Sequence, residues 1–132
     1  MRVLRNVALM LSALAAVPAT AEPLRDGYPP AIRGLIYKDD ATSVIVYVET
    51  DGRHVVAISP DGKILWRKDP FVDAGLEPYR EPHPTIVFIG SSGRGCALRA
   101  ESIGKVFCLS FSSSQFGVVD IVTGKFTPEG QN

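Results

Sequence analysis

The chain has two histidines, and either could act as the base of a hydrolytic site. They are His54 and His83, and Ser91 or Ser92 could supply the nucleophile. A Ser–His site of the α/β-hydrolase type needs a G-x-S-x-G elbow between a strand and a helix. The Gly-Ser-Ser-Gly run at 90–93 lacks that spacing, and no helical pattern follows it. We therefore expect no enzyme activity, and a small hydrolase is the least favoured alternative.

The acidic residues and the glycines form no recognisable metal or phosphate motif. Asp39 and Asp40 are adjacent, whereas Asp51 and Asp61 each precede a glycine, as tight turns require. The sequence has no H-E-x-x-H motif, no cysteine cluster and no acidic loop with calcium spacing. The glycines at 90–95 fit neither the dinucleotide-binding nor the P-loop pattern. We expect neither a metal nor a cofactor.

Cys96 and Cys108 are the only cysteines, and an even pair in an oxidising compartment normally forms a disulfide. A redox-active pair is the alternative, but the C-x-x-C spacing is missing. We expect strands at 96–100 and 105–109 to form a hairpin, with Gly104 in its turn. Placing Cys96 directly opposite Cys108 would bring their Cβ atoms close to disulfide distance. The pair is therefore predicted to be structural.

A proline-rich segment at 69–84 is the strongest candidate for a binding site. Tyrosine and arginine are favoured anchors in protein interfaces, and proline lowers the entropy lost on binding. The candidate partner-binding residues are Phe71, Tyr79, Arg80 and His83. The alternative is a plain crossover between strands, in which Phe71 and Tyr79 cover the core.

The elements that must position these residues are strands. The stretch at 43–49 is almost entirely β-branched or aromatic, which favours a buried strand. It is followed by a Thr-Asp-Gly-Arg turn and then by a Pro-Asp-Gly-Lys turn, which predicts an antiparallel meander. Strands are expected at 34–38, 43–49, 54–59, 64–68, 85–89 and 115–122, with a helical turn at 72–75 and a frayed tail at 127–132.

No segment of ten or more residues has a helical apolar stripe, so the fold class is all-β. The expected architecture is a small antiparallel meander that forms a sandwich or a half-open barrel with one disulfide. An exposed sheet edge would also allow self-association, which makes a homodimer an alternative to a monomer.

Residues 1–21 have the pattern of a cleaved signal peptide. Two arginines precede an apolar run at 7–17, and small residues follow at 19–21. A membrane span needs about 20 apolar residues, so an anchor is disfavoured and an uncleaved helix is the alternative. We expect residues 22–132 to form a single domain that is periplasmic or secreted.

The charge balance argues against nucleic-acid binding. The 132 residues include 14 basic and 14 acidic side chains, and loss of the leader would leave a slight acidic excess. Such a chain has no basic surplus with which to neutralise a phosphate backbone. Its hydrophobic content of 45% is ample for a core and excludes global disorder.

Two stretches of the chain are weakly similar to each other. The sequence at 55–66 can be laid over 116–126, and each copy is an apolar strand, a Gly-Lys turn and an apolar restart. This pattern resembles the blade repeat of quinoprotein-like β-propellers, in which an aspartate and a Thr-Gly-Lys or Asp-Gly-Lys turn lead to a tryptophan. The second copy has Asp120 but no tryptophan, and the first has Trp66 but Ser59 in place of the aspartate. The resemblance implies blade-like sheets, and it implies no cofactor or activity.

These patterns together favour an exported, non-enzymatic domain that binds another protein. The concrete form is an inhibitor or immunity protein that occludes a toxin or lytic enzyme with a loop. The alternative is an envelope-assembly or structural factor that uses an open sheet edge.

Overall fold

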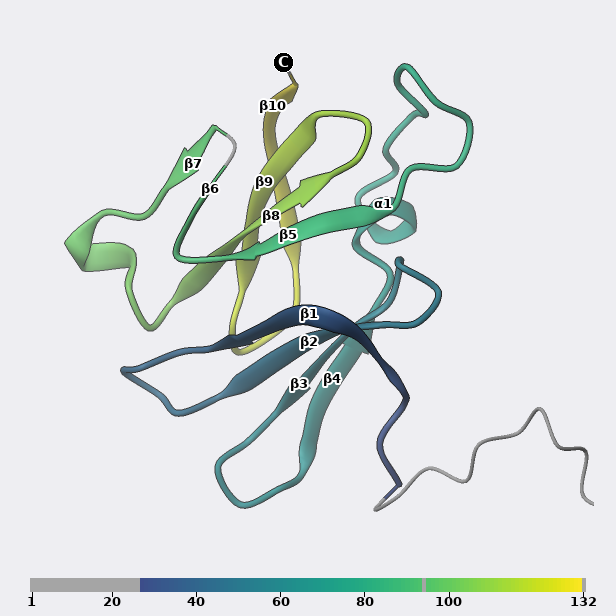
Figure 1. Cartoon of the computed structure of the whole chain (residues 1–132). Helices are drawn as coiled ribbons and strands as arrows, with labels where there is room; N and C mark the ends of the chain where they lie inside the picture. Colours follow the sequence, from purple (N-terminus) through teal and green to yellow (C-terminus); the bar gives the residue numbers. More distant parts are fainter. Residues whose placement is uncertain (1–26, 94, 132) are drawn as a thin grey trace, which may run out of the picture.

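The computed structural model describes residues 27–93 and 95–131 (Figure 1). The predicted signal peptide at 1–21 lies outside these residues. No helix within the described part of the chain is long and apolar enough to cross a bilayer. The elements are β1 (Ala31–Lys38), β2 (Ile45–Glu49), β3 (Val55–Ile58), β4 (Ile64–Lys68), α1 (Pro70–Asp73), β5 (Ile86–Gly90), β6 (Ser92–Gly93), β7 (Cys96–Ala97), a 3₁₀ turn η2 (Ala100–Ser102), β8 (Val106–Phe111), β9 (Gln115–Asp120) and β10 (Phe126–Gln131).

The strands form two four-stranded antiparallel sheets, which confirms the all-β prediction. The first sheet has the order β1-β2-β3-β4, and the second has the order β10-β9-β8-β5. The short pair β6-β7 stands apart as an excursion between β5 and β8 (Figure 1). Within residues 27–93 and 95–131, the strands do not close into a barrel. The two predicted Asp-Gly turns are present. Their glycines, Gly52 and Gly62, have positive φ values of 71° and 85°, which glycine adopts more readily than other residues.

The core lies between the two sheets. Alternate residues of β2, including Val46 and Val48, face inward and are fully buried. They meet Phe107, Leu109 and Phe111 of β8, which are also fully buried. Burying side chains of this size stabilises the fold by roughly 1.5–3 kcal/mol each.

Trp66 of β4 joins the two sheets directly. Its ring stacks on Phe107 with the ring centres 6.4 Å apart. Its indole N–H donates a hydrogen bond to the carbonyl oxygen of Ile121, just after β9, at 2.8 Å. A buried indole needs such a partner, so this contact fixes both the position and the orientation of β4.

The disulfide between Cys96 and Cys108 is present, as predicted, but the expected hairpin is wrong. Cys108 of β8 is opposite Gly90 of β5, and Cys96 lies in β7, which pairs with β6. Residues 98–105 form a loop with a 3₁₀ turn instead of a strand pair. Both neighbours of β8 are already taken by β5 and β9, so β7 cannot join that sheet. The disulfide therefore fastens an excursion to the second sheet.

The expected frayed tail is also wrong. Residues Phe126–Gln131 form β10, which pairs with β9 along its length despite Pro128. Proline is accepted there because β10 is an edge strand and its outer backbone groups need no partner in the sheet. Gly117 of β9 allows the close approach, since a Cβ there would lie 2.2 Å from the Thr127 carbonyl oxygen.

The two similar stretches occupy the same position in their sheets. Residues 55–66 cover β3, its turn and the start of β4, and residues 116–126 cover β9, its turn and the start of β10. In the second turn, the Asp120 carboxylate accepts hydrogen bonds from the backbone N–H groups of Val122 and Thr123. The similarity to propeller blades stays a prediction.

Candidate binding loop

The segment at 69–84 begins with the short helix α1, whose start is determined by neighbouring residues in the sequence. The Asp69 side chain accepts a hydrogen bond from the Val72 N–H at 3.2 Å and so caps α1. Pro70 takes the first helical position, where its missing N–H costs nothing. The helix therefore starts two residues before the predicted turn at 72–75.

Phe71 points into the core and not toward solvent. It is 7% exposed and packs edge-on against Phe111, with the ring centres 5.5 Å apart. The guanidinium of Arg53 lies over the Phe71 ring, 4.6 Å from the ring centre. Phe71 therefore supports the loop from the core, as the crossover alternative expects, and its role in partner contact stays a prediction.

Arg53 also fixes the start of the segment. Its guanidinium lies 3.4 Å from the Asp69 carboxylate, and both side chains are largely buried. Such a pair is weak when exposed, but partial burial and the Phe71 ring hold the arginine in place. The turn between β2 and β3 is thereby linked to the helix α1.

A buried glutamine holds the middle of the segment. The Gln115 side-chain amide donates a hydrogen bond to the Glu77 carbonyl oxygen at 3.1 Å. Its side-chain oxygen accepts a hydrogen bond from the Ser113 hydroxyl at 2.8 Å. Gln115 is 8% exposed, so both partners are required to offset its burial.

The end of the segment is fixed by two neighbouring turns. The backbone N–H groups of Thr85 and Ile86 donate to the Ser112 hydroxyl and to the Gly52 carbonyl oxygen. Pro84, just before them, is fully buried. Gly52 has a positive φ and lies against Thr85, so the β2–β3 turn touches both ends of the segment.

Between these fixed points, the loop exposes its polar tip. Arg80 has φ of 64°, which is unusual for a residue with a side chain. Its guanidinium lies 5.0 Å from the centre of the Tyr79 ring. Arg80 and His83 are exposed and Tyr79 is half-buried. The structure thus brings three of the four predicted contact residues onto one loop tip, which projects at the upper right of Figure 1.

The other histidine, His54, belongs to the β2–β3 turn. Its ring nitrogen Nδ1 lies 2.5 Å from the Asp51 carboxylate, which also accepts from the backbone N–H groups of Arg53 and His54. Burial alone would raise the pKa of Asp51, but these hydrogen bonds outweigh it and lower the pKa to about 2. The His54–Asp51 pair stabilises a turn that supports the loop.

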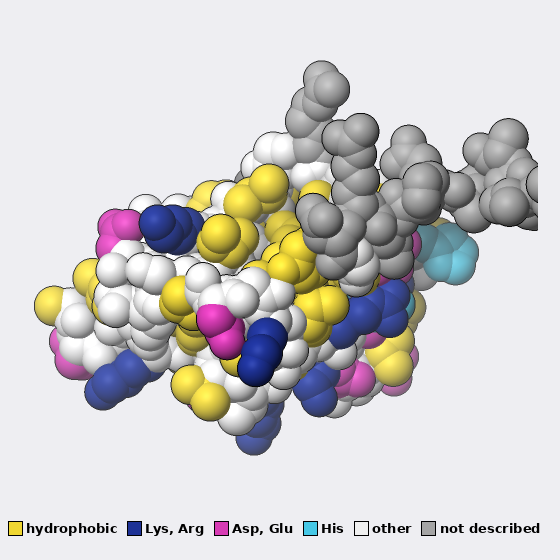
Figure 2. Space-filling model, turned by 90° about the horizontal axis from the view of Figure 1, so that it is seen from below, with side chains coloured by type: hydrophobic (Ala, Val, Ile, Leu, Met, Phe, Trp, Pro, Cys, Tyr) yellow, Lys and Arg dark blue, Asp and Glu magenta, His cyan; other side chains and the backbone are white. Residues whose placement is uncertain are grey.

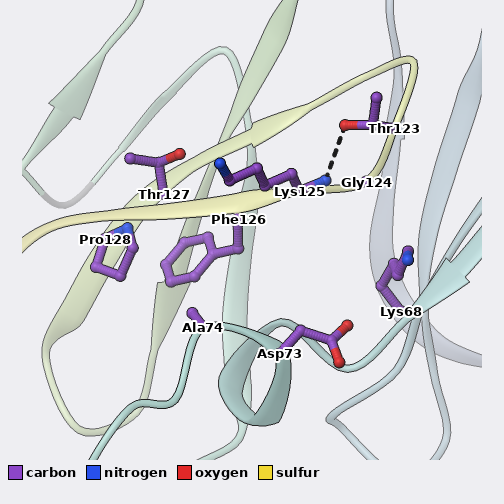
Figure 3. A pocket seen from close by; sticks show the side chains of 9 residues that line it. All are labelled: Lys68, Asp73, Ala74, Thr123, Gly124, Lys125, Phe126, Thr127 and Pro128. Atoms are coloured by element: carbon purple, nitrogen blue, oxygen red, sulfur yellow. Dashed lines mark hydrogen bonds between the residues drawn. The ribbon is translucent and has the colours of Figure 1, made fainter.

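A groove of about 550 Å³ lies beside α1 (Figure 3). Its charged lining residues are Lys68, Lys125 and Asp73, and the two lysine side chains point in different directions (Figure 3). The hydrogen bond drawn there runs from the Lys125 N–H to the Thr123 hydroxyl, within one turn. The groups do not converge on one position, so the groove offers no defined place for a ligand.

Ser91 and Ser92, the candidate nucleophiles of the hydrolase alternative, lie outside the loop and outside the β2–β3 turn. Ser92 lies in β6, and the Ser91 carbonyl oxygen accepts a hydrogen bond from the Leu98 N–H in the disulfide-bonded excursion. In residues 27–93 and 95–131, no three His, Cys, Asp or Glu side chains come together as a group that could hold a metal ion.

Three supporting residues were missed by the sequence reading. Asp69 followed by Pro70 is a recognisable helix start and could have been found from the chain alone. Arg53 and Gln115 could not, because their contacts with the loop join residues distant in the sequence.

No known protein family, curated protein or solved structure matches this chain.

Proposed function

We propose that this protein is exported and acts by binding another protein through the tip of the 69–84 loop. The observation that carries the proposal is the contrast between the fixed base of the loop and its exposed tip. Arg53, Gln115 and Gly52 hold the base, while Tyr79 and Arg80 remain accessible. A loop that is already ordered loses little entropy on binding, which favours affinity.

The side chains at the tip suit a protein partner. Tyrosine and arginine contribute disproportionately to binding energy at interfaces, and stacking of one on the other presents a combined apolar and cationic surface. A loop that projects from a rigid β-scaffold can enter the cleft of a second protein. We therefore propose an inhibitor or immunity protein directed at a toxin or lytic enzyme, without catalytic activity of its own.

Export is the second part of the proposal. The disulfide is compatible with a location outside the cytoplasm, because such bonds persist in oxidising compartments. Together with the sequence pattern at 1–21, it supports a periplasmic or secreted protein. Mass spectrometry of the protein recovered after export should give a chain that begins at Glu22. A full-length mass would contradict cleavage of the leader.

Affinity capture from an envelope extract tests the binding role. The exported protein should retain one stoichiometric partner, and Tyr79→Ala with Arg80→Ala should reduce recovery at least about tenfold. Arg99→Ala with Ile103→Ala changes exposed residues outside the loop and is the matched control. Equal recovery with the loop variant would remove the loop from the interface.

A further inference from the structure

Arg80, at the tip of the 69–84 loop, has a backbone conformation that residues with side chains rarely adopt. Its φ of 64° lies in the left-handed region. Ser43 and Ser114 share this feature, but each donates a backbone hydrogen bond across a tight hairpin turn. Residues 80–83 bend without a hydrogen-bonded turn. The conformation of Arg80 therefore has no local explanation of this kind.

The contacts that hold Arg80 in this conformation lie on both sides of it in the chain. The Gln115 side chain binds the Glu77 carbonyl oxygen before it, and the Thr85 N–H donates to the Ser112 hydroxyl after it. Glycine or asparagine would adopt a positive φ at lower cost than arginine. Residues held in such conformations are concentrated at binding and active sites. The strain therefore points to a role for the Arg80 side chain beyond stability.

The charged group of Arg80 is open to a partner. Its guanidinium carbon lies over the Tyr79 ring, 5.0 Å from the ring centre, and this contact uses none of its five N–H donors. Glu77 and Glu81 are the nearest acidic residues in the sequence, and neither belongs to an ion pair within residues 27–93 and 95–131. Arg80 is exposed, so both its charge and its donors are accessible.

Two other arginines differ from Arg80 in this respect. Arg53 lies 3.4 Å from the Asp69 carboxylate, and Arg67 lies 2.6 Å from the Glu49 carboxylate. Each of these ion pairs joins two separate elements, so both guanidinium groups act within the fold. The ring that Arg80 contacts belongs to its neighbour in the sequence, so that contact joins no two elements.

The overall charge of the protein would not attract a partner over a long distance. The full chain has 14 basic and 14 acidic side chains. On the face seen in Figure 2, acidic and basic side chains lie among one another wherever grey atoms do not cover them. A surface without an excess of one charge gives weak electrostatic steering. Recognition by charge therefore depends on single groups such as Arg80.

We propose that Arg80 is the residue with which the loop selects its partner, and that the partner presents an aspartate or glutamate carboxylate in the cleft that the loop enters. The proposal rests on the proposed function of the loop. A carboxylate matches the guanidinium with two parallel hydrogen bonds. It also supplies the opposite charge that a cation needs when an interface removes it from water. Tyr79 then contributes the apolar contact beside this pair.

Affinity capture from an envelope extract, with the immobilised protein at a series of densities, gives the apparent affinity for the partner. Arg80→Gln keeps a long polar side chain but loses the charge, and should lower the affinity at least about tenfold. Arg80→Lys keeps the charge but not the paired geometry, and should give an intermediate affinity. Arg99→Gln is the matched control, since Arg99 is exposed, lies outside the loop and has an ordinary φ of −80°.

The urea midpoint of unfolding supplies a readout that does not need the partner. Arg80→Asn should raise the midpoint, because asparagine accepts the left-handed conformation more readily than arginine. The same variant should bind as weakly as Arg80→Gln. A protein that becomes more stable and binds less well is expected where a residue is strained for binding. A midpoint below that of the unaltered protein would overturn the proposal.

The capture results distinguish failure of this proposal from failure of the proposed function. If Tyr79→Ala with Arg80→Ala loses the partner while Arg80→Gln retains it, the loop binds but the carboxylate contact is refuted. If Arg80→Lys binds no better than Arg80→Gln, the partner does not recognise charge, and the proposal also fails. Unchanged recovery with the double alanine variant, or the absence of any partner, would remove the proposed function of the loop and this proposal with it.

Discussion

Gln115 shows how much one buried polar side chain can organise. It connects Ser113 in its own turn to Glu77 in the loop, and it does so from a strand of the second sheet. Its position in β9 is set by the pairing of that strand with β10. The order of the candidate binding loop therefore depends on a residue well outside the loop.

Replacing this side chain should loosen the loop. Gln115→Ala leaves the Glu77 carbonyl oxygen without its partner, and we expect a loss of about 1–3 kcal/mol in the free energy of unfolding. Hydrogen exchange should also become faster in the loop around residues 77–81. Thr127→Ala, at an exposed position of β10 that is not opposite Gln115, is the control. Unchanged exchange in the loop would show that Gln115 does not hold it.

Asp51 makes the β2–β3 turn sensitive to acid. The folded-state pKa of Asp51 is about 2, below the ordinary value of 3.8. The charge of Asp51 therefore stabilises the fold fully at pH values above 3.8. The stabilisation is lost as the pH falls from about 4 toward 2. The side chain is 45% exposed, so solvent screening reduces the size of the effect.

The prediction concerns urea midpoints at pH 5 and pH 2.5. Asp51→Asn should show a smaller acid-induced decrease than the unaltered protein, because the amide keeps an acceptor but has no charge to lose. Asp39 also has a lowered pKa: burial would raise it, but hydrogen bonds from Thr42 and others outweigh that effect, so some acid sensitivity should remain. Asp73→Asn, at an exposed position, should behave like the unaltered protein. An identical decrease in Asp51→Asn would contradict this account.

At the scale of elements, the disulfide constrains the β6–β7 excursion and adds no link between the strands of the two main sheets. The β6–β7 pair has only two residues in each strand, which is too few to be stable alone. The bond to Cys108 fixes it to β8 and closes a loop with a sequence separation of 12. The main sheets have their own ladders and a shared core.

Removing both cysteines should therefore affect the excursion most. For Cys96→Ser with Cys108→Ser, we expect a loss of about 3 kcal/mol in the free energy of unfolding. Amide exchange in the 91–105 region should become fast in native conditions, while β2 and β9 stay protected. Loss of protection throughout both sheets would show that the disulfide is needed for the whole fold.

At the scale of the whole molecule, the two sheets share one core and should unfold together. Trp66 is the only tryptophan, and it lies where β4 contacts Phe107 and Ile121. Its fluorescence therefore reports whether the sheets are docked. Circular dichroism reports the strands themselves.

We expect both measurements to give one urea transition with the same midpoint. A sheet without its partner would expose the valines of β2 or the phenylalanines of β8, which is too costly for a stable intermediate. Fluorescence that changes at lower urea than circular dichroism would indicate that the sheets separate before they unfold.

The strands of the first sheet could be predicted because they depend on local patterns. The β-branched run at 43–49 and the Asp-Gly turns set strand and turn within a few residues. The hairpin at the cysteines could not be predicted correctly in the same way. Its register depended on which strands were free to pair with β8, and β5 and β9 had already taken both sides.

The sequence by itself determined the class of fold and the cysteine pair, because strand and turn patterns and the number of cysteines can be read from the chain without knowing its tertiary contacts. Only the tertiary structure decided that Phe71 is a core residue and that β10 is a full strand. It also decided that Arg53 and Gln115 hold the loop. Each of these depends on contacts between distant segments, which form only when the two sheets pack together.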